Sequence, residues 1–191
     1  MIEYKRLTKD DLEEMFYFYE TYLNEGEFMR DQLREEIEDE SFVGYKAVED
    51  GKTIGICFGK DKLELTYPHP RLEQKIMKAK GNLKLHCVDA MVVDKDYRYM
   101  GVSTGMLKAY KEEIADKGYD LIFGEIWIYP DGHMPVNKPM MTFGKPYWES
   151  VEKMYYRNLS KYGLTCPVCG KKCICGAKLT LYNFEREEAK E

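Results

Sequence analysis

VVDKDYRYMGVSTGML, residues 92–107, is the stretch of sequence that decides the fold. An apolar run ends at Val93, a polar turn follows, and Met106 and Leu107 mark the apolar side of a helix. Backbone N–H groups at a helix start have no partner within the helix, and the helix dipole adds partial positive charge there. A strand, a turn and a helix in this order therefore predict a binding site for an anion such as a pyrophosphate.

The side chains of the turn suit that role. Gly101 has no Cβ, so a phosphate oxygen can approach the backbone closely. Ser103 is small and carries a hydroxyl group, and Arg98 can add a charge-assisted hydrogen bond. From the residues alone, an ordinary strand-to-helix turn with Gly101 at a tight bend explains the pattern equally well.

The spacing Arg98-x-x-Gly101-x-Ser103 resembles the acyl-CoA-binding motif of the GNAT superfamily of N-acetyltransferases, R/Q-x-x-G-x-G/A. Tyr97 before the arginine and the apolar pair after the motif are also usual in that family. Ser103 stands where the family has Gly or Ala. The order of elements over residues 1–164 resembles the family as well.

The resemblance implies acetyl-CoA as the co-substrate. It implies that amides of residues 100–104 hold the pyrophosphate and that backbone groups of Met91 and Val93 bind the pantetheine arm. It also implies that their strand splays from the next one to admit the thioester. The implied cofactor-binding residues are Met91, Val93, Arg98, Tyr99, Met100, Gly101, Val102, Ser103 and Thr104.

Strand-like and helix-like segments alternate outward from this turn. Thr8 begins a capping-box pattern, an Asp-Gly step at residues 50–51 indicates a hairpin, and Pro146 is expected to open a last helix. That helix would carry Val151, Tyr155, Leu159 and Tyr162 on one stripe. The expected strands cover residues 2–7, 42–48, 53–59, 83–93, 120–129 and 178–184. The first expected helix begins after Thr8 and ends near residue 23. The others cover residues 29–38, 70–80, 103–117 and the region after 146.

The composition bounds the class of protein. The chain has 191 residues, 44% hydrophobic and 33% charged, which is typical of a globular domain. No apolar run approaches the roughly 18 residues of a membrane span, and the N-terminus has no secretory pattern, so we expect a cytoplasmic protein without a membrane partner. A net charge of −5 disfavours nucleic-acid binding and favours a cationic acceptor such as a primary amine.

Direct acyl transfer needs a group that takes the amine proton. Because family enzymes often use a carboxylate on the central strand, Asp89 is the first candidate; it is expected to share a face with Cys87, Met91 and Val93. Glu125 on the next strand is the second. For both, a structural carboxylate satisfied by its neighbours is an equally good interpretation. His86 fits a hydrogen-bonded strand residue better than a base, and the strand cysteines Cys57 and Cys87 fit apolar packing better than a covalent route.

The departing thiolate needs a proton. The family often uses a Tyr in the last helix, but that position falls near Leu159 here. Tyr155 and Tyr156 lie about one turn earlier, and Tyr156 is preferred, with sheet packing the expected role of Tyr155. The long segment 129–145 is expected to cover the acceptor side as a lid, with a rigid surface loop as the alternative. His133 within it could contact the acceptor.

Four cysteines crowd into ten residues near the C-terminus. Their C-x₂-C and C-x-C spacing resembles a zinc knuckle, and four thiolates leave no open position, as in structural zinc sites. A redox disulfide or an iron–sulfur cluster is the less favoured alternative. Lys171 and Lys172 at the tip leave a recognition role open. The expected ligands are Cys166, Cys169, Cys173 and Cys175.

The sequence thus predicts an α/β protein with the acyl-CoA N-acyltransferase (GNAT) fold, a mixed, mostly antiparallel sheet with helices on both faces. We expect one domain over residues 1–184, a zinc hairpin at 164–178 and a charged tail at 185–191. The expected activity is transfer of an acetyl group from acetyl-CoA to an unidentified amine. The alternatives are a non-catalytic module that binds acyl-CoA or docks a protein through the zinc hairpin, and, less favoured, a nucleic-acid-binding zinc protein. Dimers are common in the family, so a homodimer is one state to test.

Overall fold

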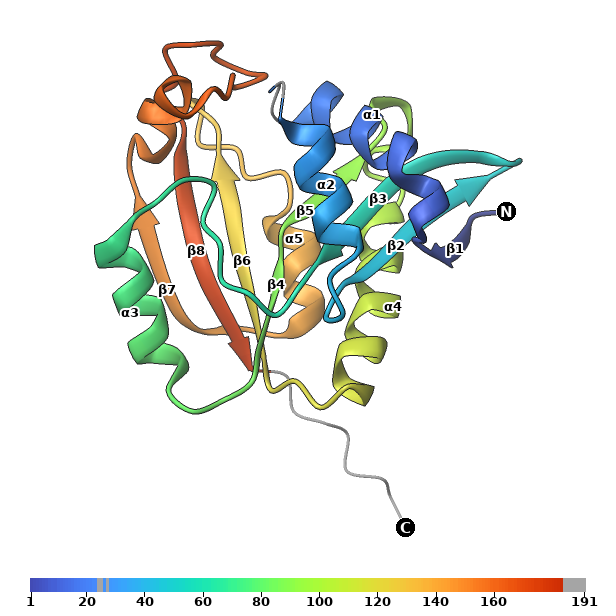
Figure 1. Ribbon diagram of the computed structural model, residues 1–191, viewed down its shortest axis with the longest axis horizontal. Helices are drawn as coiled ribbons and strands as arrows, with labels where there is room; N and C mark the ends of the chain where they lie inside the picture. Colours follow the sequence, from blue (N-terminus) through green and yellow to red (C-terminus); the bar gives the residue numbers. More distant parts are fainter. Residues whose placement is uncertain (24–25, 27, 184–191) are drawn as a thin grey trace.

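The computed structural model describes residues 1–23, 26 and 28–183 (Figure 1). The expected tail at 185–191 and the last residue of the expected final strand lie outside these ranges. In the described residues the strands are β1 (Glu3–Arg6), β2 (Val43–Glu49), β3 (Lys52–Gly59), β4 (Leu85–Val88), β5 (Ala90–Val93), β6 (Leu121–Ile128), β7 (Pro146–Glu152) and β8 (Gly176–Asn183). The α-helices are α1 (Leu12–Tyr22), α2 (Met29–Ile37), α3 (Pro70–Lys80), α4 (Val102–Asp116) and α5 (Asn137–Met140), with 3-10 turns η1 (Lys9–Asp11), η2 (Lys95–Tyr97), η3 (Met141–Phe143) and η4 (Tyr155–Tyr162).

These strands form two four-stranded sheets, with the orders β1-β2-β3-β5 and β4-β6-β8-β7. All described pairings are antiparallel except that of β4 with β6. The pairing is thus mostly antiparallel, as expected, but it is divided between an antiparallel sheet and a mixed sheet rather than contained in one mixed sheet. None of the helices in the described ranges is both long and apolar enough to cross a membrane.

The expected strand 83–93 is divided at Asp89 into β4 and β5, because the pairing with β6 ends there. The N–H of Cys87 donates to Lys60 at 2.8 Å and that of Asp89 to Phe58 at 3.0 Å, so β3 follows the chain across the break. The close approach needs a glycine: a Cβ on Gly59 would lie 1.9 Å from the Cys87 carbonyl oxygen. The pairing of β4 with β6 ends at Val88 and Gly124. Beyond that point β5 pairs with β3, and β6 pairs with β8.

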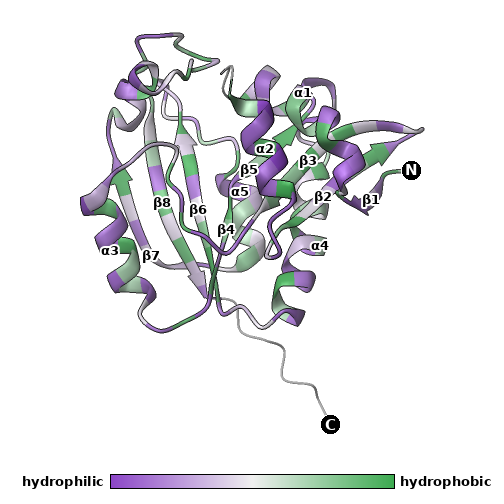
Figure 2. Cartoon of the chain, in the orientation of Figure 1, coloured by the Kyte–Doolittle hydropathy of each residue, from purple (hydrophilic) through white to green (hydrophobic). Residues whose placement is uncertain are grey.

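Helices cover both faces of the first sheet. α1 and α2 lie on one face and α4 on the other (Figure 1). The stripe of α2 that faces inward contains Met29, Leu33 and Ile37, all buried as the periodicity predicted. β4 and β5 are drawn mainly in the hydrophobic colour and α2 mainly in the hydrophilic colour (Figure 2). A strand covered on both faces needs apolar residues on both, whereas α2 needs them only on one stripe.

The sequence patterns predicted most element ends correctly. Thr8 and Asp11 form the capping interaction, with the Thr8 N–H donating to the Asp11 carboxylate at 2.8 Å. The hairpin between β2 and β3 turns at Asp50 and Gly51, whose φ angles are +50° and +78°. α4 ends before Gly118, which has a φ of +80°.

The prediction of a last helix from Pro146 was wrong. Residues Pro146–Glu152 form β7, which pairs with β8 at the edge of the second sheet, and only Tyr155–Tyr162 is helical, as a 3-10 turn. The side chains of β7 alternate between exposed and half-buried, a period of two. Proline is tolerated at the first position of an edge strand as well as at the start of a helix, so its presence did not distinguish the two.

Candidate active site

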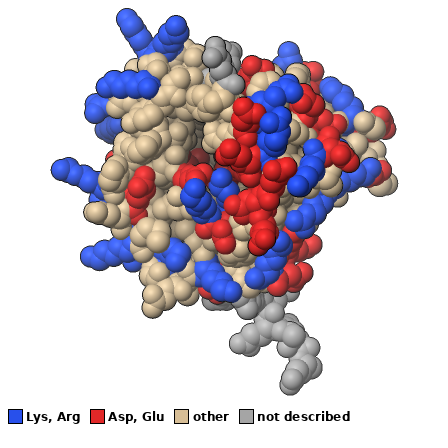
Figure 3. All heavy atoms as spheres, viewed as in Figure 1, with Lys and Arg blue, Asp and Glu red and all other residues tan. Residues whose placement is uncertain are grey.

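A cavity of about 1220 Å³ opens where β5 and β6 separate. Its walls come from β5, β6, α1, α2, the start of α4 and the segment 129–140. Figure 3 shows this face hollowed between a largely uncharged part and a strongly charged part, with acidic side chains at the hollow. Single-ligand pockets commonly occupy about 300–1,000 Å³, so this cavity has room for two substrates side by side.

The start of α4 forms one end of the cavity. Gly101 caps the helix with a φ of +82°, and its carbonyl accepts the first helical hydrogen bond, from Gly105 at 3.0 Å. The N–H groups of Val102, Ser103 and Thr104 therefore have no partner within the helix. A Cβ at Gly101 would have nothing within 4 Å, so this side of the turn is open for a ligand.

The neighbouring residues hold the turn in shape. The Asp94 carboxylate accepts the Asp96 N–H at 3.1 Å, and these contacts, together with Lys52, lower the pKa of Asp94. Arg98 donates from Nε to the Val93 carbonyl at 3.2 Å, and its guanidinium lies 5.4 Å from the centre of the Tyr22 ring. Among the described residues, no acceptor binds the other guanidinium N–H groups of Arg98, so they can donate to an anion.

β5 presents an open edge to the same space. Its residues pair with β3 on one side, and no described strand pairs with the other side. Met91 and Val93 line the cavity from this strand, and all the residues of the expected cofactor set except Met100 lie along its wall. The side chain of Met100 is exposed, and that of Tyr99 is almost entirely so, at 94%.

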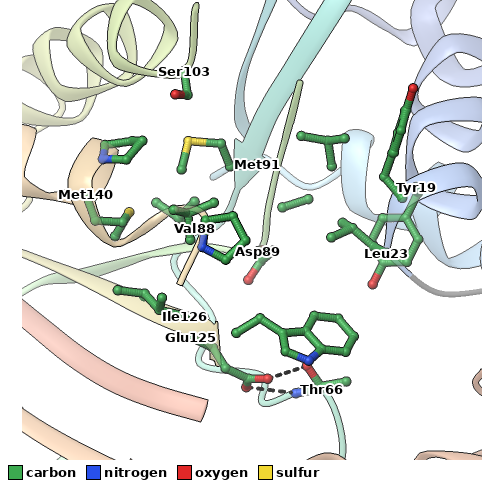
Figure 4. Close-up of a pocket in the computed structure, with 18 of the residues that line it drawn as sticks. Tyr19, Leu23, Thr66, Val88, Asp89, Met91, Ser103, Glu125, Ile126 and Met140 are labelled. Carbon is green, nitrogen blue, oxygen red and sulfur yellow. Dashed lines mark hydrogen bonds between the residues drawn. The ribbon is translucent and has the colours of Figure 1, made fainter. Parts of the chain in front are cut away.

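Asp89 lies at the break between β4 and β5, and Figure 4 shows its carboxyl group among the residues that line the pocket. Because the ladder is interrupted there, the expected alternation with Cys87, Met91 and Val93 does not extend to it. Its carboxyl group meets that of Glu36 from α2, and burial, followed by the Glu36 charge, raises the pKa of Asp89 well above its ordinary value. Glu36 was missed from sequence, although it falls on the stripe of α2 defined by Leu33 and Ile37.

Glu125 and Tyr156, two of the expected catalytic residues, are in direct contact. The Glu125 carboxylate accepts hydrogen bonds from the Tyr156 hydroxyl at 2.7 Å and the Tyr155 hydroxyl at 3.1 Å. It also accepts from the N–H of Thr66 at 3.2 Å and from the Thr66 hydroxyl, the two bonds drawn in Figure 4. Burial and the Glu125 charge raise the pKa of Tyr156 well above its ordinary value, so this hydroxyl keeps its proton. No pattern in the sequence pointed to Thr66, which comes from an irregular segment.

Comparison with known proteins identifies the fold by structure and not by sequence. No protein-family profile matches the sequence, and no curated protein matches it. The structure is similar to that of the ribosomal-protein-S18-alanine N-acetyltransferase from Escherichia coli, at 12% identity and a TM-score of 0.61, over 100% of this chain and 99% of that chain. The chain has the GNAT fold. An N-acetyltransferase from Staphylococcus aureus Mu50 aligns over 96% of this chain and 97% of that chain, at 10% identity and a TM-score of 0.60. A Desulfovibrio desulfuricans protein described as a member of the GNAT family aligns at 10% identity and a TM-score of 0.55, over 96% of this chain and 99% of that chain.

In this GNAT fold the later part of the segment 129–145 is packed against the core, and its earlier part is more exposed to solvent. Its later part forms α5 and η3, and Met140 and Phe143 are buried against the core around α4. Residues from both parts line the cavity, among them His133, Met134 and Met140. The lid stays a prediction, and the buried later part is anchored as a rigid loop of the alternative interpretation would be.

The four cysteines meet at one point beside the cavity. Their sulfur atoms all lie within 4.8 Å of one another, and those of Cys169 and Cys175 are 3.5 Å apart, too far for a disulfide. Tetrahedral zinc with Zn–S bonds of about 2.3 Å needs sulfur separations of about 3.8 Å. Backbone N–H groups point at Cys166 and Cys173 sulfurs, each at 3.4 Å. The donor set and its spacing fit a zinc ion.

The cysteine turn also forms part of the cavity wall. Pro167 and Val168, which lie between the first two cysteines, line the cavity. Gly170 has a φ of +67°, the left-handed conformation that lets the turn close. A metal that fixes this turn would therefore fix one edge of the candidate active site.

The remaining sequence candidates, His86, Cys57 and Cys87, do not line the cavity. His86 is fully buried and lies 2.7 Å from the Tyr110 hydroxyl and 3.0 Å from the Ser41 carbonyl, outside the cavity lining. Cys57 and Cys87 are buried in the core, and burial raises the pKa of both thiols. These positions agree with the packing roles expected for the three side chains.

Proposed function

We propose that the protein is an N-acetyltransferase that moves the acetyl group of acetyl-CoA directly onto an amine. The observation that carries this proposal is the continuity of the cavity. One space connects the unpaired N–H groups at the start of α4, the open edge of β5 and the carboxyl groups of Asp89 and Glu125. An anion site, a backbone edge and a proton acceptor are the three elements that acetyl-CoA binding and acyl transfer require. The GNAT fold supports the same reaction class.

Each end of the cavity has a proposed role. The α4 amides and Arg98 hold the pyrophosphate, and the backbone of Met91 and Val93 pairs with the pantetheine arm. A backbone N–H near Val93 polarises the thioester carbonyl, because a donor fixed in place stabilises the charge that develops on its oxygen.

The carboxyl groups of Asp89 and Glu125 have different proposed roles in proton transfer. Asp89 is the proposed base, because its raised pKa brings it closer to the pH at which it must accept a proton. Glu125 is the second candidate, but four donors already surround it. Tyr156 lines the cavity and is the proposed proton donor to the departing thiolate, with Glu125 holding its hydroxyl in place.

Zinc is the proposed metal at Cys166, Cys169, Cys173 and Cys175. Bound there, it supplies a crosslink between η4 and β8 rather than chemistry, because four thiolates leave no open coordination position. Four free thiols need a reducing compartment, so the cytoplasm is the proposed location.

The test is an assay of CoA thiol release with acetyl-CoA and a panel of primary amines. We expect amine-dependent release that falls about 100-fold or more in Asp89→Asn, since a general base contributes factors of this order. Acetyl-CoA affinity should be unchanged in that variant. Asp116→Asn, at the exposed end of α4, is the matched control. Acetyl-CoA binding without release for any amine would contradict the proposal and favour a non-catalytic acyl-CoA-binding module.

A further inference from the structure

A second carboxyl group stands beside Asp89 at the acceptor end of the cavity. Glu36 is only 6% exposed, whereas its neighbour Glu35 on α2 is exposed. Oε1 of Glu36 and Oδ2 of Asp89 are both shielded from solvent, and no N–H or hydroxyl group in the described part of the chain donates to either. Each carboxyl group acts on the pKa of the other, so the two lie close together. Two buried carboxyl groups this close do not both ionise, so the pair holds one proton and one negative charge.

The charges around the pair do not neutralise it. Lys60 is 8% exposed and lies near both carboxyl groups, but its ammonium nitrogen is 3.0 Å from the Glu64 carboxylate. Glu64 also contacts Lys62, an exposed side chain, and Asp39 adds a more distant negative charge. With one shared proton, the pair, Glu64 and Asp39 carry three negative charges against the two positive charges of Lys60 and Lys62. An amine that enters as its ammonium ion would supply the missing positive charge.

Aromatic side chains supply the rest of the recognition surface. Tyr19 and Tyr22 from α1 line the cavity on the same side as Glu36, and Tyr67 and Trp127 line it near Glu125. Figure 4 shows Tyr19 and Leu23 on the wall opposite Met140 and Ile126. Aromatic faces attract both cations and apolar groups. The cavity therefore suits an ammonium group attached to an aromatic or apolar body.

We propose that Glu36 and Asp89 together form the subsite that receives the ammonium group of the acceptor and takes its proton, and that the acceptor is a primary amine carrying an aromatic or apolar group. This rests on the proposed acetyltransferase function. Glu36 binds the ammonium, and Asp89 is the catalytic member of the pair.

The protons balance as follows. The bound ammonium gives one proton to the pair, which becomes fully protonated, and the neutral amine attacks the thioester carbonyl. The N–C bond forms and the C–S bond breaks. Tyr156 gives its proton to the thiolate to form the free thiol, and the second amine proton replaces it on the Tyr156 hydroxyl. The pair then returns its extra proton to solvent, so one acetyl group is transferred and one proton is released per turnover.

The experiment uses 2-phenylethylamine as the probe, titrated into the full chain saturated with CoA. Its ammonium form should bind to the wild type, and its neutral counterpart 2-phenylethanol should bind about 10-fold or more weakly, as expected when a charged hydrogen bond is lost. Glu36→Gln should lower the affinity for 2-phenylethylamine by a similar factor. The matched control Glu35→Gln, one residue away on the exposed face of α2, should behave as wild type.

The pH dependence gives a second readout. Burial raises the pKa of Glu36 and of Asp89, so the pair takes its second proton at a higher pH than isolated carboxyl groups do. Affinity for the ammonium probe should fall as the pH drops through that range. The titratable groups that face the pair are Lys60, Glu64 and Asp39, with Cys57, Cys87 and the Tyr110 hydroxyl on the side of Asp89. Glu36→Gln should change this pH profile, because Asp89 then titrates without a second carboxyl group beside it, whereas Glu35→Gln should keep the wild-type profile.

Three outcomes would overturn the subsite: no binding of 2-phenylethylamine to the wild type, equal binding of the alcohol, or wild-type binding by Glu36→Gln. If Glu36→Gln does not fold, Asp89→Asn removes the charge from the other partner and must lower the probe affinity by a similar factor. Acetyl-CoA titration distinguishes a failure of the proposed function from a failure of the subsite. Loss of acetyl-CoA binding in the wild type contradicts the proposed function, whereas intact acetyl-CoA binding with unaltered probe binding in both variants contradicts the subsite alone.

Discussion

Four donors converge on the Glu125 carboxylate, which makes it the most fully hydrogen-bonded of the expected catalytic side chains. Two of the donors are hydroxyl groups of Tyr155 and Tyr156, which lie on a different element from Glu125. A carboxylate with its acceptor positions occupied is better placed to orient these hydroxyls than to take a proton from an amine. The network therefore connects η4 to the floor of the cavity.

Glu125→Gln tests that interpretation. A glutamine amide places an N–H₂ group against at least one of these donors, so we expect a loss of stability of roughly 1–3 kcal/mol, the cost of a buried polar group left without a partner. Urea denaturation measures the loss. Glu20→Gln, on the exposed face of α1, should change stability by less than about 0.5 kcal/mol. Equal stability of the two variants would contradict the structural role of Glu125.

The buried His86 predicts how stability depends on pH. Burial lowers the pKa of His86 below its ordinary value of 6.5, so the folded protein keeps the neutral ring where the unfolded chain already binds a proton. Stability that is fully present above about pH 6.5 is therefore lost as the pH falls toward the lowered pKa. The expected slope is at most about 1.4 kcal/mol per pH unit.

Urea denaturation between pH 7.5 and pH 5 measures this slope. Since carboxyl groups with raised pKa values contribute in the opposite sense, the comparison is made between variants. His86→Asn should show a shallower slope than wild type, and His133→Asn, on the exposed loop, should keep the wild-type slope. Identical slopes in both variants would contradict the assignment to His86.

At this scale the sequence was informative where a residue acts through its own backbone or its local spacing. Gly101 and Arg98 could be proposed as site residues from a motif, and the four cysteines could be proposed as metal ligands from their spacing. Glu36 and Thr66 could not be found in this way, because their importance depends on which distant residues they meet. Glu36 meets Asp89 across 53 positions of the chain.

At the scale of elements, the separation of β5 from β6 creates the cavity. The separation depends on the break at Asp89, where the chain passes from a strand paired with β6 to one paired with β3 alone. The sequence predicted one continuous strand, because the apolar pattern runs through residues 85–93 with only His86 and Asp89 to interrupt it. An isolated polar residue in a strand pattern does not show where the pairing with a neighbouring strand ends.

The error at the last helix has a similar origin. The apolar residues between 146 and 162 match both a period of 3.6 and a mixture of edge strand and 3-10 turn. Met154 resolves the ambiguity in the structure with a φ of +50°, which ends β7 and starts η4. A left-handed residue that is not glycine gives no signal in the sequence.

The cysteine turn gives a prediction about two elements at once. Removing zinc with a chelator under reducing conditions should release about one zinc ion per chain and lower the melting temperature, because the four thiolates crosslink the end of η4 to the start of β8. Mass spectrometry under native conditions and thermal denaturation are the measurements. Cys169→Ser should reproduce the loss, and Cys57→Ser, outside the cluster, should keep the metal. A metal-free protein of equal stability would contradict the role of the crosslink.

At the scale of the whole molecule, the chain consists of two sheets joined through the β4–β5 crossing, with the cavity between them (Figure 1). A ligand in that cavity would contact both sheets. The order of elements and the resemblance of the turn after β5 to the GNAT motif were enough to predict the fold, but not its division into two sheets. The acceptor end was not predictable to the same degree, because it is assembled from α1, α2, β6 and two irregular segments that are adjacent only in the folded chain.

The most direct test of the account is calorimetric titration of the zinc-replete protein with acetyl-CoA. We expect binding with a dissociation constant in the micromolar range for the wild type and for Gly51→Glu. That control introduces the same side chain at a glycine with a similar φ, +78° against +82°, in the β2–β3 turn away from the cavity. Gly101→Glu should weaken binding on the order of 100-fold or more, because its carboxylate would face the pyrophosphate. Unchanged affinity in Gly101→Glu, or no binding to the wild type, would contradict the acetyl-CoA site on which the whole account depends.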